Sequence, residues 1–315
     1  MLNRRHLRVK VLQALYSYYQ SEVKDFKPFE KALLGSVESV QELYIWLLSL
    51  LVEIADQSVL DAEERASKHL PTPEDLSVNI KLQENRFIVS LKQNPAYLAA
   101  VKKYKISWDF DPEVSKSAFD ALKNTEDYAN YLHLDSHSIQ SDKDIIKHIF
   151  KKIILKSPGI VQVFEEKFIN WQVDKEVLQA LIAKTFKNFS SENPEDNQLA
   201  SICPNWDEDR PFIINLFLKT ILFEEEYQKM IAEKTKNWET DRIAMIDILL
   251  MRMAIAEILH FSTIPVKVTI NEYIEISKEF STPKSNSFIN GILDKILFDL
   301  QKEGKVRKQD RGLRE

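Results

Sequence analysis

The residues with the clearest chemical potential are three arginines near the start of the chain, Arg4, Arg5 and Arg8, which Lys10 follows. No acidic residue precedes Glu22, so nothing nearby in the sequence offsets their charge. A guanidinium donates two hydrogen bonds at once and therefore suits phosphate. The dipole of a helix disfavours cations in its first turn by about 0.3–1 kcal/mol each. The pattern indicates either a phosphate-binding site or a basic helix start that packs against acids elsewhere.

A helix must position these side chains. Asn3 is a good N-cap residue before the stretch RRHLRVKVLQALYSYYQ. At 100° per residue, Leu7, Val11 and Leu15 lie on one broad apolar face, and Arg4 and Arg8 lie on the same side. We therefore expect the arginines to project past the rim of the core, where a ligand can reach them.

Composition limits the classes of protein that the chain can represent. Its 315 residues are 44% hydrophobic and 29% charged, which allows a sizeable core, and the net charge is −5. This charge excludes a nucleic-acid-binding protein with a strongly basic body, so any phosphate site must be a local patch. There are five glycines, and neither a G-x-G-x-x-G nor a P-loop motif is present.

Other residues with possible chemistry are weaker candidates. Glu257 and His260 have the spacing of a di-iron ligand pair, but no second Glu-x-x-His occurs. Cys203 is the single cysteine, which excludes an internal disulfide and fits a reducing, cytoplasmic compartment. We expect no metal site, no cofactor and no catalytic residue. The apolar stretch 43–55 contains Glu53 and is interpreted as a buried helix, not as a membrane span.

Helical periodicity runs through almost the whole chain, and no segment alternates strictly, so we predict an all-α fold of about ten helices. A weak internal repeat is also present. Residues 144–175 match residues 211–242 at a constant offset of 67, which aligns Trp171 with Trp238. The repeat indicates two stacked helical units, or two amphipathic hairpins that share a pattern by chance.

Gly291 lies inside the predicted helix FINGILDKIL, residues 288–297. A glycine in a helix interior costs about 1 kcal/mol relative to alanine. One explanation is close packing, since a residue without a side chain lets another helix approach. We expect the helix that begins near Val266 to pack there; a local kink or an early helix cap is the alternative.

The C-terminal third resembles the NusB family of transcription antitermination factors. The resemblance rests on three motifs. They are R-x-x-x-x-D-x-x-x-x-R-x-x-x-x-E from Arg242 to Glu257, P-x-K-V-x-I-N-E-x-I-E-x-x-K-x-F from Pro265 to Phe280, and F-I-N-G-I-L-D-K from Phe288 to Lys295. The arginines and LQALY at residues 12–16 are similar to the first helix of the family.

The resemblance implies a NusB-like helical bundle that is enlarged by an inserted helical region. The expected organisation is a basic first helix at 1–24, a helical insertion at 25–200, a C-terminal core at 201–300 and a basic flexible tail at 301–315. The tail carries five basic residues after Gly304, which indicate either a disordered end or extra attraction for RNA.

The resemblance also implies a function. Such proteins bind the boxA element of ribosomal RNA leader transcripts together with the ribosomal protein NusE, and they promote readthrough by RNA polymerase. They are not enzymes. A helical protein-interaction scaffold that has lost RNA binding is the alternative, which the long insertion and the acidic net charge would suit. An RNA-modifying enzyme is a third hypothesis, but the chain has no glycine-rich cofactor loop.

The site residues follow from the resemblance position by position. Arg4, Arg5 and Arg8 would meet RNA phosphates, and Lys284 and Phe288 lie in the segment near the RNA. Phe288 could stack on an unpaired base, which is worth about 1–3 kcal/mol. Lys284 stands where the family commonly has an acid. Two further residues, Tyr16 and Asp247, match positions on the partner-facing side of the family.

Overall fold

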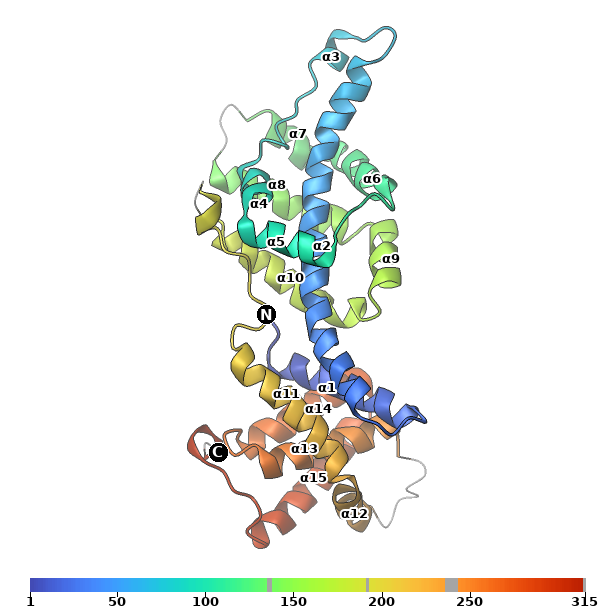
Figure 1. Ribbon diagram of the computed structural model, residues 1–315, viewed down its shortest axis with the longest axis vertical. Helices are drawn as coiled ribbons and strands as arrows, with labels where there is room; N and C mark the ends of the chain where they lie inside the picture. The colour runs from blue at the N-terminus through green and yellow to red at the C-terminus, as the bar shows by residue number, and fades with distance from the viewer. Residues whose placement is uncertain (135–137, 191–192, 236–242, 314–315) are drawn as a thin grey trace. The chain divides into compact units, whose positions relative to one another are not determined.

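The computed structural model describes residues 1–134, 138–190, 193–235 and 243–313, and in these residues it contains helices and no strand (Figure 1). The all-α prediction is therefore confirmed. The described residues form fifteen α-helices, more than the ten expected, because short helices such as α3 (Pro73–Leu76) and α7 (Glu126–Leu132) lie within stretches rich in turn-forming residues. The predicted first helix is confirmed as α1 (Arg4–Gln20).

The chain divides into two compact units. We call them the terminal unit, residues 2–37 and 203–315, and the inserted unit, residues 38–202 together with Met1. The helix α2 (Lys27–Ala66) contributes its residues up to Val37 to the terminal unit and the rest to the inserted unit. The first predicted boundary, at residue 24, thus lies before the start of α2, whereas the structural boundary falls inside this helix, after Val37.

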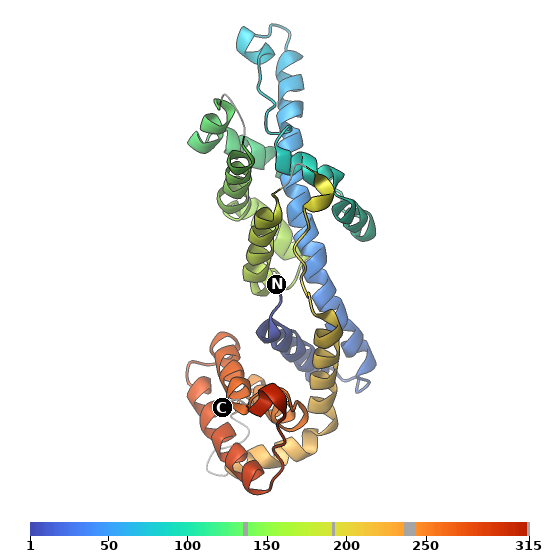
Figure 2. The same cartoon turned by 90° about the vertical axis from the view of Figure 1, so that its left-hand side faces the viewer.

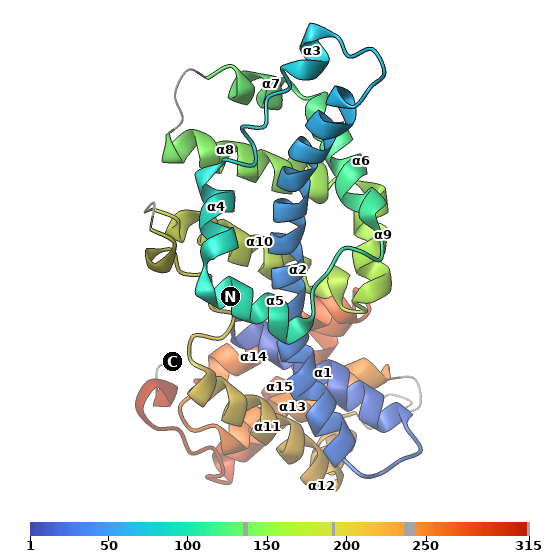
Figure 3. The ribbon, with the colours of Figure 1, turned by 45° about the horizontal axis from the view of Figure 1, so that its top comes forward.

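The inserted unit is built around α2. Figure 1 and Figure 3 show α4 (Arg86–Gln93) on one side of this helix, with α6 (Pro112–Lys123) and α9 (Pro158–Lys167) on the other. Besides α3 and α7, the described part of the unit contains α5 (Pro95–Tyr104), α8 (Ile139–His148), the π-helix η1 (Ile149–Ile154), α10 (Trp171–Asn188) and the 3-10 helix η2 (Pro194–Asp196).

The helix α2 is the one helix in the described residues that is long and apolar enough to cross a membrane, and this is weak evidence for a span. Inside the protein, 72% of its most apolar window is buried. Leu47, Leu51 and Ile54 are among its residues with no exposed surface. The prediction of a buried helix at 43–55 is confirmed, since a helix that is apolar on most sides is typical of a protein core.

The terminal unit packs around α13 (Met245–His260). This helix contacts α1, α11 (Trp206–Leu222), α12 (Glu224–Lys234), α14 (Val266–Phe280) and α15 (Ser285–Lys302). Residues 249–258 of α13 are all buried, as expected for a helix with apolar residues all round. The helix α11 begins directly after Asn205, where Asp207, Glu208 and Asp209 favour the positive N-terminal end of a helix.

The two halves of the predicted repeat have similar helix boundaries. Shifted by 67 residues, α8 with η1 coincides with α11, and α9 coincides with α12 to within one residue. The second tryptophan of the pattern, Trp238, lies outside the described residues, as do Asn237 and Asp241. Duplication therefore stays a prediction, which the matching boundaries support.

The interpretation of Gly291 as a site of close packing is wrong. A Cβ atom built on Gly291 would have no other atom within 4 Å. The close approach occurs instead at Gly312, where a Cβ would lie 2.0 Å from the carbonyl oxygen of Ser262. Gly312 belongs to the final 3-10 helix η4 (Asp310–Leu313), which lies beside the orange helices of the terminal unit in Figure 2.

Candidate nucleic-acid interface

The start of α1 is held by a reciprocal cap. The side chain of Asn3 accepts a hydrogen bond from the backbone N–H of His6 at 3.0 Å, and the imidazole Nδ1 of His6 accepts one from the N–H of Asn3 at 3.3 Å. The predicted N-cap is therefore confirmed. It orients the first turn, from which Arg4 and Arg5 extend.

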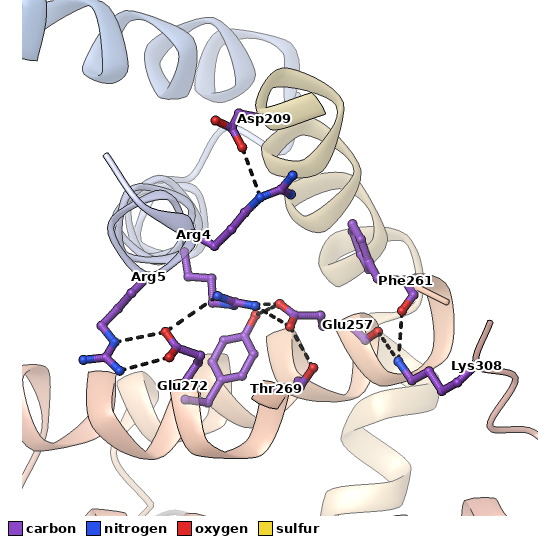
Figure 4. A network of polar contacts seen from close by, with 10 residues as sticks. Arg4, Arg5, Asp209, Glu257, Phe261, Thr269, Glu272 and Lys308 are labelled. Carbon is purple, nitrogen blue, oxygen red and sulfur yellow. Dashed lines mark hydrogen bonds and ion pairs between the residues drawn. The ribbon is translucent and has the colours of Figure 1, made fainter. Parts of the chain in front are cut away.

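Arg8 does not project past the rim of the core, and this expectation is wrong. Its side chain is 2% exposed and donates two hydrogen bonds to the carboxylate of Glu257, at 2.6 and 2.8 Å (Figure 4). Thr269 and Tyr273 of α14 donate to the same carboxylate at 2.8 and 3.1 Å. The physical reason is that Glu257 has no exposed surface, and a buried carboxylate needs a cation and hydrogen-bond donors.

The pKa values of this buried cluster reflect the same balance. Burial disfavours the charged form of Arg8, but the hydrogen bonds and the charge of Glu257 outweigh it and raise the pKa of Arg8. Burial, followed by the charge of Glu257, raises the pKa of Tyr273 well above its ordinary value. Arg8 therefore stays ionised and Tyr273 stays a hydrogen-bond donor, so the cluster fastens α1 to α13 and α14. Lys10 is also buried, at 1% exposure.

Arg5 lies at the edge of this cluster. Its guanidinium donates to both carboxylate oxygens of Glu272 on α14, at 3.0 and 2.9 Å, and its side chain is 37% exposed. The hydrogen bonds that Arg5 donates to Glu272 raise the pKa of Arg5. Glu272 also lies 3.7 Å from Arg8, so one carboxylate joins the exposed arginine to the buried one.

Arg4 points toward α11. Its Nε lies 3.0 Å from a carboxylate oxygen of Asp209, a Glu208 oxygen is 3.7 Å away, and the side chain is 38% exposed. The guanidinium also lies 4.3 Å from the ring centre of Phe212, a cation–π contact. Burial raises the pKa of Asp209, and the charge of Arg4 opposes that rise. All three arginines thus have acidic partners, which matches the second interpretation of the sequence pattern.

A groove of about 1130 Å³ runs between these side chains. Its charged lining residues are Arg4, Arg5, Arg8, Asp207, Glu208 and Glu272, and Pro211, Phe212, Phe261, Ile264 and Val268 supply its apolar surface. Two of the apolar residues, Phe212 and Phe261, pack edge to face at 5.4 Å. All of the lining residues belong to the terminal unit. The groove therefore combines two half-exposed guanidinium groups and apolar side chains, which suit phosphate groups and the faces of bases, with carboxylates that hold the guanidinium groups when no RNA is bound.

The second group of predicted site residues surrounds the start of α15. Lys284 is the exposed residue that precedes this helix, and Phe288 is half-buried in its first turn. No acidic residue occupies the first turn. The N-terminal end of an 18-residue helix carries partial positive charge, so Lys284 adds to a local field that attracts anions.

Asp247 is not a surface residue, contrary to the expectation that it faces a partner. It is 5% exposed, and its two carboxylate oxygens accept hydrogen bonds from Ser281 at 2.5 Å and Ser285 at 2.7 Å. Asp247 therefore ties the start of α13 to the segment that carries Lys284. Tyr16, by contrast, is 40% exposed on α1 and remains accessible.

Arg252, another residue of the C-terminal motifs, belongs to a separate polar cluster. It donates to Glu224 and to Gln228 of α12, each at 2.9 Å, and Tyr19 of α1 donates to Glu224 at 2.9 Å. The motif residue Arg242 lies outside the described residues. This cluster holds α1, α12 and α13 together.

The C-terminal segment is anchored and not free, so the expectation of a flexible tail is wrong for its described part. Lys308 donates to the carbonyl oxygens of Phe261 at 2.9 Å and of Glu257 at 3.4 Å, at the end of α13 (Figure 4). The backbone N–H of Gln309 donates to the carbonyl of Ser262 at 2.9 Å. Burial lowers the pKa of Lys308 to about 8. These two carbonyl groups also accept backbone N–H groups, from Phe261 and Ile264, so Lys308 adds a second donor at the C-terminal end of the helix, where a cation is favoured.

Sequence reasoning missed the acids that pair with the arginines. The sequence places Glu257 in a family motif and beside His260, whose imidazole instead lies 2.9 Å from the hydroxyl of Tyr227. A signal was present: Glu257 follows the apolar run of residues 253–256 in α13, and the first helix carries cations without acids. A buried carboxylate needs a cation, and the first helix carries cations that no acid near them in the sequence neutralises. Nothing in the sequence, however, assigns Glu257 to Arg8 in particular.

Comparison with known proteins agrees with this architecture. The family model described as "NusB family" matches residues 175–298. A relative from Salinibacter ruber, "Transcription antitermination protein NusB", is 46% identical over 110 residues, which are 34% of this chain and 69% of the relative. No solved structure matches.

Two further relatives carry the same name. The protein from Chloroherpeton thalassium is 43% identical over 33% of this chain and 49% of its own length, and that from Natranaerobius thermophilus is 42% identical over 25% of this chain and 56% of its own length. The similarity thus covers a third of this chain or less, yet more than two thirds of the first relative. The chain belongs to the NusB family.

Proposed function

We propose that this chain is a transcription antitermination factor that binds boxA-type RNA together with NusE and promotes readthrough by RNA polymerase in the cytoplasm. The observation that carries the proposal is the match of residues 175–298 to the NusB family, together with relatives named for transcription antitermination. The proposed RNA site consists of Arg4, Arg5, Lys284 and Phe288, and Tyr16 is the proposed contact for NusE.

The geometry of the groove supports a role in RNA binding. Arg4 and Arg5 are each more than a third exposed, and both line the groove. Two phosphate contacts on single-stranded RNA correspond to a salt slope of roughly −1.4, at −0.7 per contact. This electrostatic contribution is small, so base stacking on Phe288 and contact with NusE would have to supply much of the affinity.

Arg8 and Asp247 have supporting roles in this proposal. Arg8 is buried against Glu257, so it positions α1 without touching phosphate. Asp247 is buried against Ser281 and Ser285, so it fixes the segment that carries Lys284. Phosphate binding at Arg4 and Arg5 is then an exchange reaction, in which RNA oxygens replace carboxylate oxygens of Asp209 and Glu272.

A scaffold that has lost RNA binding is the second candidate function. One specific observation favours it: all three arginines of the first helix already have carboxylate partners. In this hypothesis, the ion pairs only stabilise the terminal unit, and the family fold serves protein contacts alone.

A binding experiment separates the two candidates. Filter binding would measure the affinity of the full chain for boxA-type RNA and for a scrambled RNA, with and without NusE. For the factor, we expect preference for boxA-type RNA, stronger binding with NusE, and a loss with Arg4→Ala/Arg5→Ala. Arg65→Ala is a control, since Arg65 is 39% exposed and paired with Asp61. Equal binding of both RNAs by the wild type and the double variant would favour the scaffold.

A further inference from the structure

A row of lysines crosses the inserted unit along α8, η1 and the residues that follow. The sequence IIKHIFKKIILK, residues 145–156, alternates apolar pairs with basic residues at a period of four. The apolar pairs at 145–146, 149–150 and 153–154 are all buried. The lysines between them are half-buried or exposed, so the basic residues form a stripe on the side opposite the core. The stripe consists of Lys147, Lys151, Lys152 and Lys156, which we call the lysine ridge.

The π-helix explains how this stripe stays aligned. In an α-helix, a step of four residues overshoots a full turn by about 40°, so a period of four would wind around the helix. A π-turn is wider, and here the N–H of Leu155 donates to the carbonyl of Phe150, five residues earlier, at 3.1 Å. Widening the helix at Ile149–Ile154 keeps the apolar pairs in the core and the lysines on one line. Such turns occur frequently at functional sites.

The ridge retains most of its positive charge. Lys147 lies 3.0 Å from Asp144, but Lys151, Lys152 and Lys156 have no ion pair with any residue that the structure describes. Burial and the nearby charge of Lys147 lower the pKa of Lys143 on the same helix. A concentration of cations is therefore present on a chain whose net charge is −5.

We propose that the lysine ridge binds the phosphate backbone of single-stranded RNA without reading its sequence. The proposal rests on the proposed function, because it assigns the inserted unit a second contact with the same transcript. Residues 147–156 are all described. The ring of Phe150 is buried at 2% exposure, and the imidazole of His148 is 14% exposed and lies 3.3 Å from Asp127. The ridge therefore offers ammonium groups but no ring for a base to stack on.

These features favour RNA over an acidic protein as the occupant. Lysine is depleted in protein–protein interfaces, where aromatic residues and arginine dominate the binding energy. A flexible ammonium on a long stem is a point charge that follows a phosphate chain in many conformations. Three phosphate contacts by Lys151, Lys152 and Lys156 correspond to a change in salt slope of roughly 2.1, at 0.7 per contact.

The experiment compares two triple variants of the full chain that lose the same charge. The ridge variant is Lys151→Gln/Lys152→Gln/Lys156→Gln. The control variant is Lys102→Gln/Lys105→Gln/Lys116→Gln, whose lysines are also exposed on the inserted unit. Fluorescence anisotropy would follow binding of a boxA-type RNA with long unstructured flanks, and of a scrambled RNA of equal length, over a range of KCl concentrations. Circular dichroism would verify that both variants fold.

We expect the ridge variant to bind both RNAs about tenfold more weakly at low salt, with a salt slope reduced by roughly 2, while the control changes far less. Equal losses in the two variants would overturn the proposal. The proposal would also be overturned if the ridge variant bound RNA as well as the wild type but no longer captured RNA polymerase. That result would place an acidic protein on the ridge.

The results that would contradict the proposed function differ from those that would contradict the lysine ridge. If the wild type binds the boxA-type and scrambled RNAs equally, the boxA assignment is wrong, but a selective loss in the ridge variant still supports the ridge. If the wild type prefers boxA-type RNA and the two triple variants behave alike, the boxA assignment stands and the ridge is overturned. A wild type that binds neither RNA overturns both.

Discussion

Arg8 of α1 and Glu257 of α13 form a two-point ion pair inside the terminal unit, although 249 positions separate them in the chain. The inserted unit lies between them in the sequence. The pair therefore fastens the first helix to the C-terminal helices independently of the insertion. It also decides which arginines of the groove are exposed, because burying Arg8 leaves Arg4 and Arg5 as its half-exposed guanidinium groups.

The first prediction concerns this ion pair. Arg8→Ala removes the cation and leaves the Glu257 carboxylate buried and uncompensated, which costs about 3–5 kcal/mol in comparable cases. We expect a loss of stability of that size, measured as the free energy of unfolding in urea. Arg65→Ala is the control, because a half-exposed ion pair contributes about 0–1 kcal/mol. A similar small effect for both variants would contradict the structural role of Arg8.

The fold class was accessible from the sequence because helical periodicity is a local property. The buried position of α2 was also accessible, since its apolar residues occur on most sides of the helix. The partners of the charged residues were not. The arginines of α1 lack acidic partners nearby in the sequence, and Glu257 of α13 follows an apolar run, but only the folded chain brings them together. The same limit applies to Asp247 and to Lys308, whose partners lie in other segments.

Local departures from regular helix geometry could likewise not be predicted from the sequence. The period of four in IIKHIFKKIILK fits neither an ideal α-helix nor a strand, and the π-turn at Ile149–Ile154 is the compromise that the fold adopts. Gly291 shows the opposite case. The sequence motif correctly marked a helix there, but the surrounding space depends on packing, and no other atom approaches the position.

The second prediction tests the exchange of carboxylate for phosphate at Arg5. Glu272→Gln removes the charge that competes with RNA, so we expect binding of boxA-type RNA to strengthen by about fivefold, the equivalent of about 1 kcal/mol for a partly exposed ion pair. Glu275→Gln is a matched control on the same helix, with the same change of charge and an ion pair to Lys278 instead. Filter binding measures both. Equal gains in the two variants would show that only net charge matters, and that Glu272 does not compete at Arg5.

The third prediction concerns pH and Lys308. Its pKa falls from the ordinary 10.5 to about 8 because burial disfavours the ammonium. Between these two values, the unfolded chain holds more protons than the folded one, so the contribution of Lys308 to stability rises with pH. Compared with Lys308→Met, the wild type should therefore gain unfolding free energy from about pH 8 to about pH 10.

Urea denaturation at several pH values measures this difference. Lys305→Met is the control, since hydrogen bonding to Glu303 raises the pKa of Lys305 instead. A group with a raised pKa loses its contribution as pH increases, so any trend for Lys305 has the opposite sign. A difference between wild type and Lys308→Met that stays constant with pH would contradict the burial of the Lys308 amine.

The last prediction uses the open space beside Gly291. Because a Cβ there meets no other atom and the residue lies within α15, Gly291→Ala should stabilise the chain by about 0.5–1 kcal/mol through helix propensity alone. Urea denaturation of the free protein measures the gain, and a loss of stability would mean that a neighbour packs against Gly291 after all. Binding of boxA-type RNA and NusE supplies the second readout. If the same variant is more stable yet binds either partner more weakly, the glycine is required by the bound partner, since the folded chain itself leaves room for the methyl group.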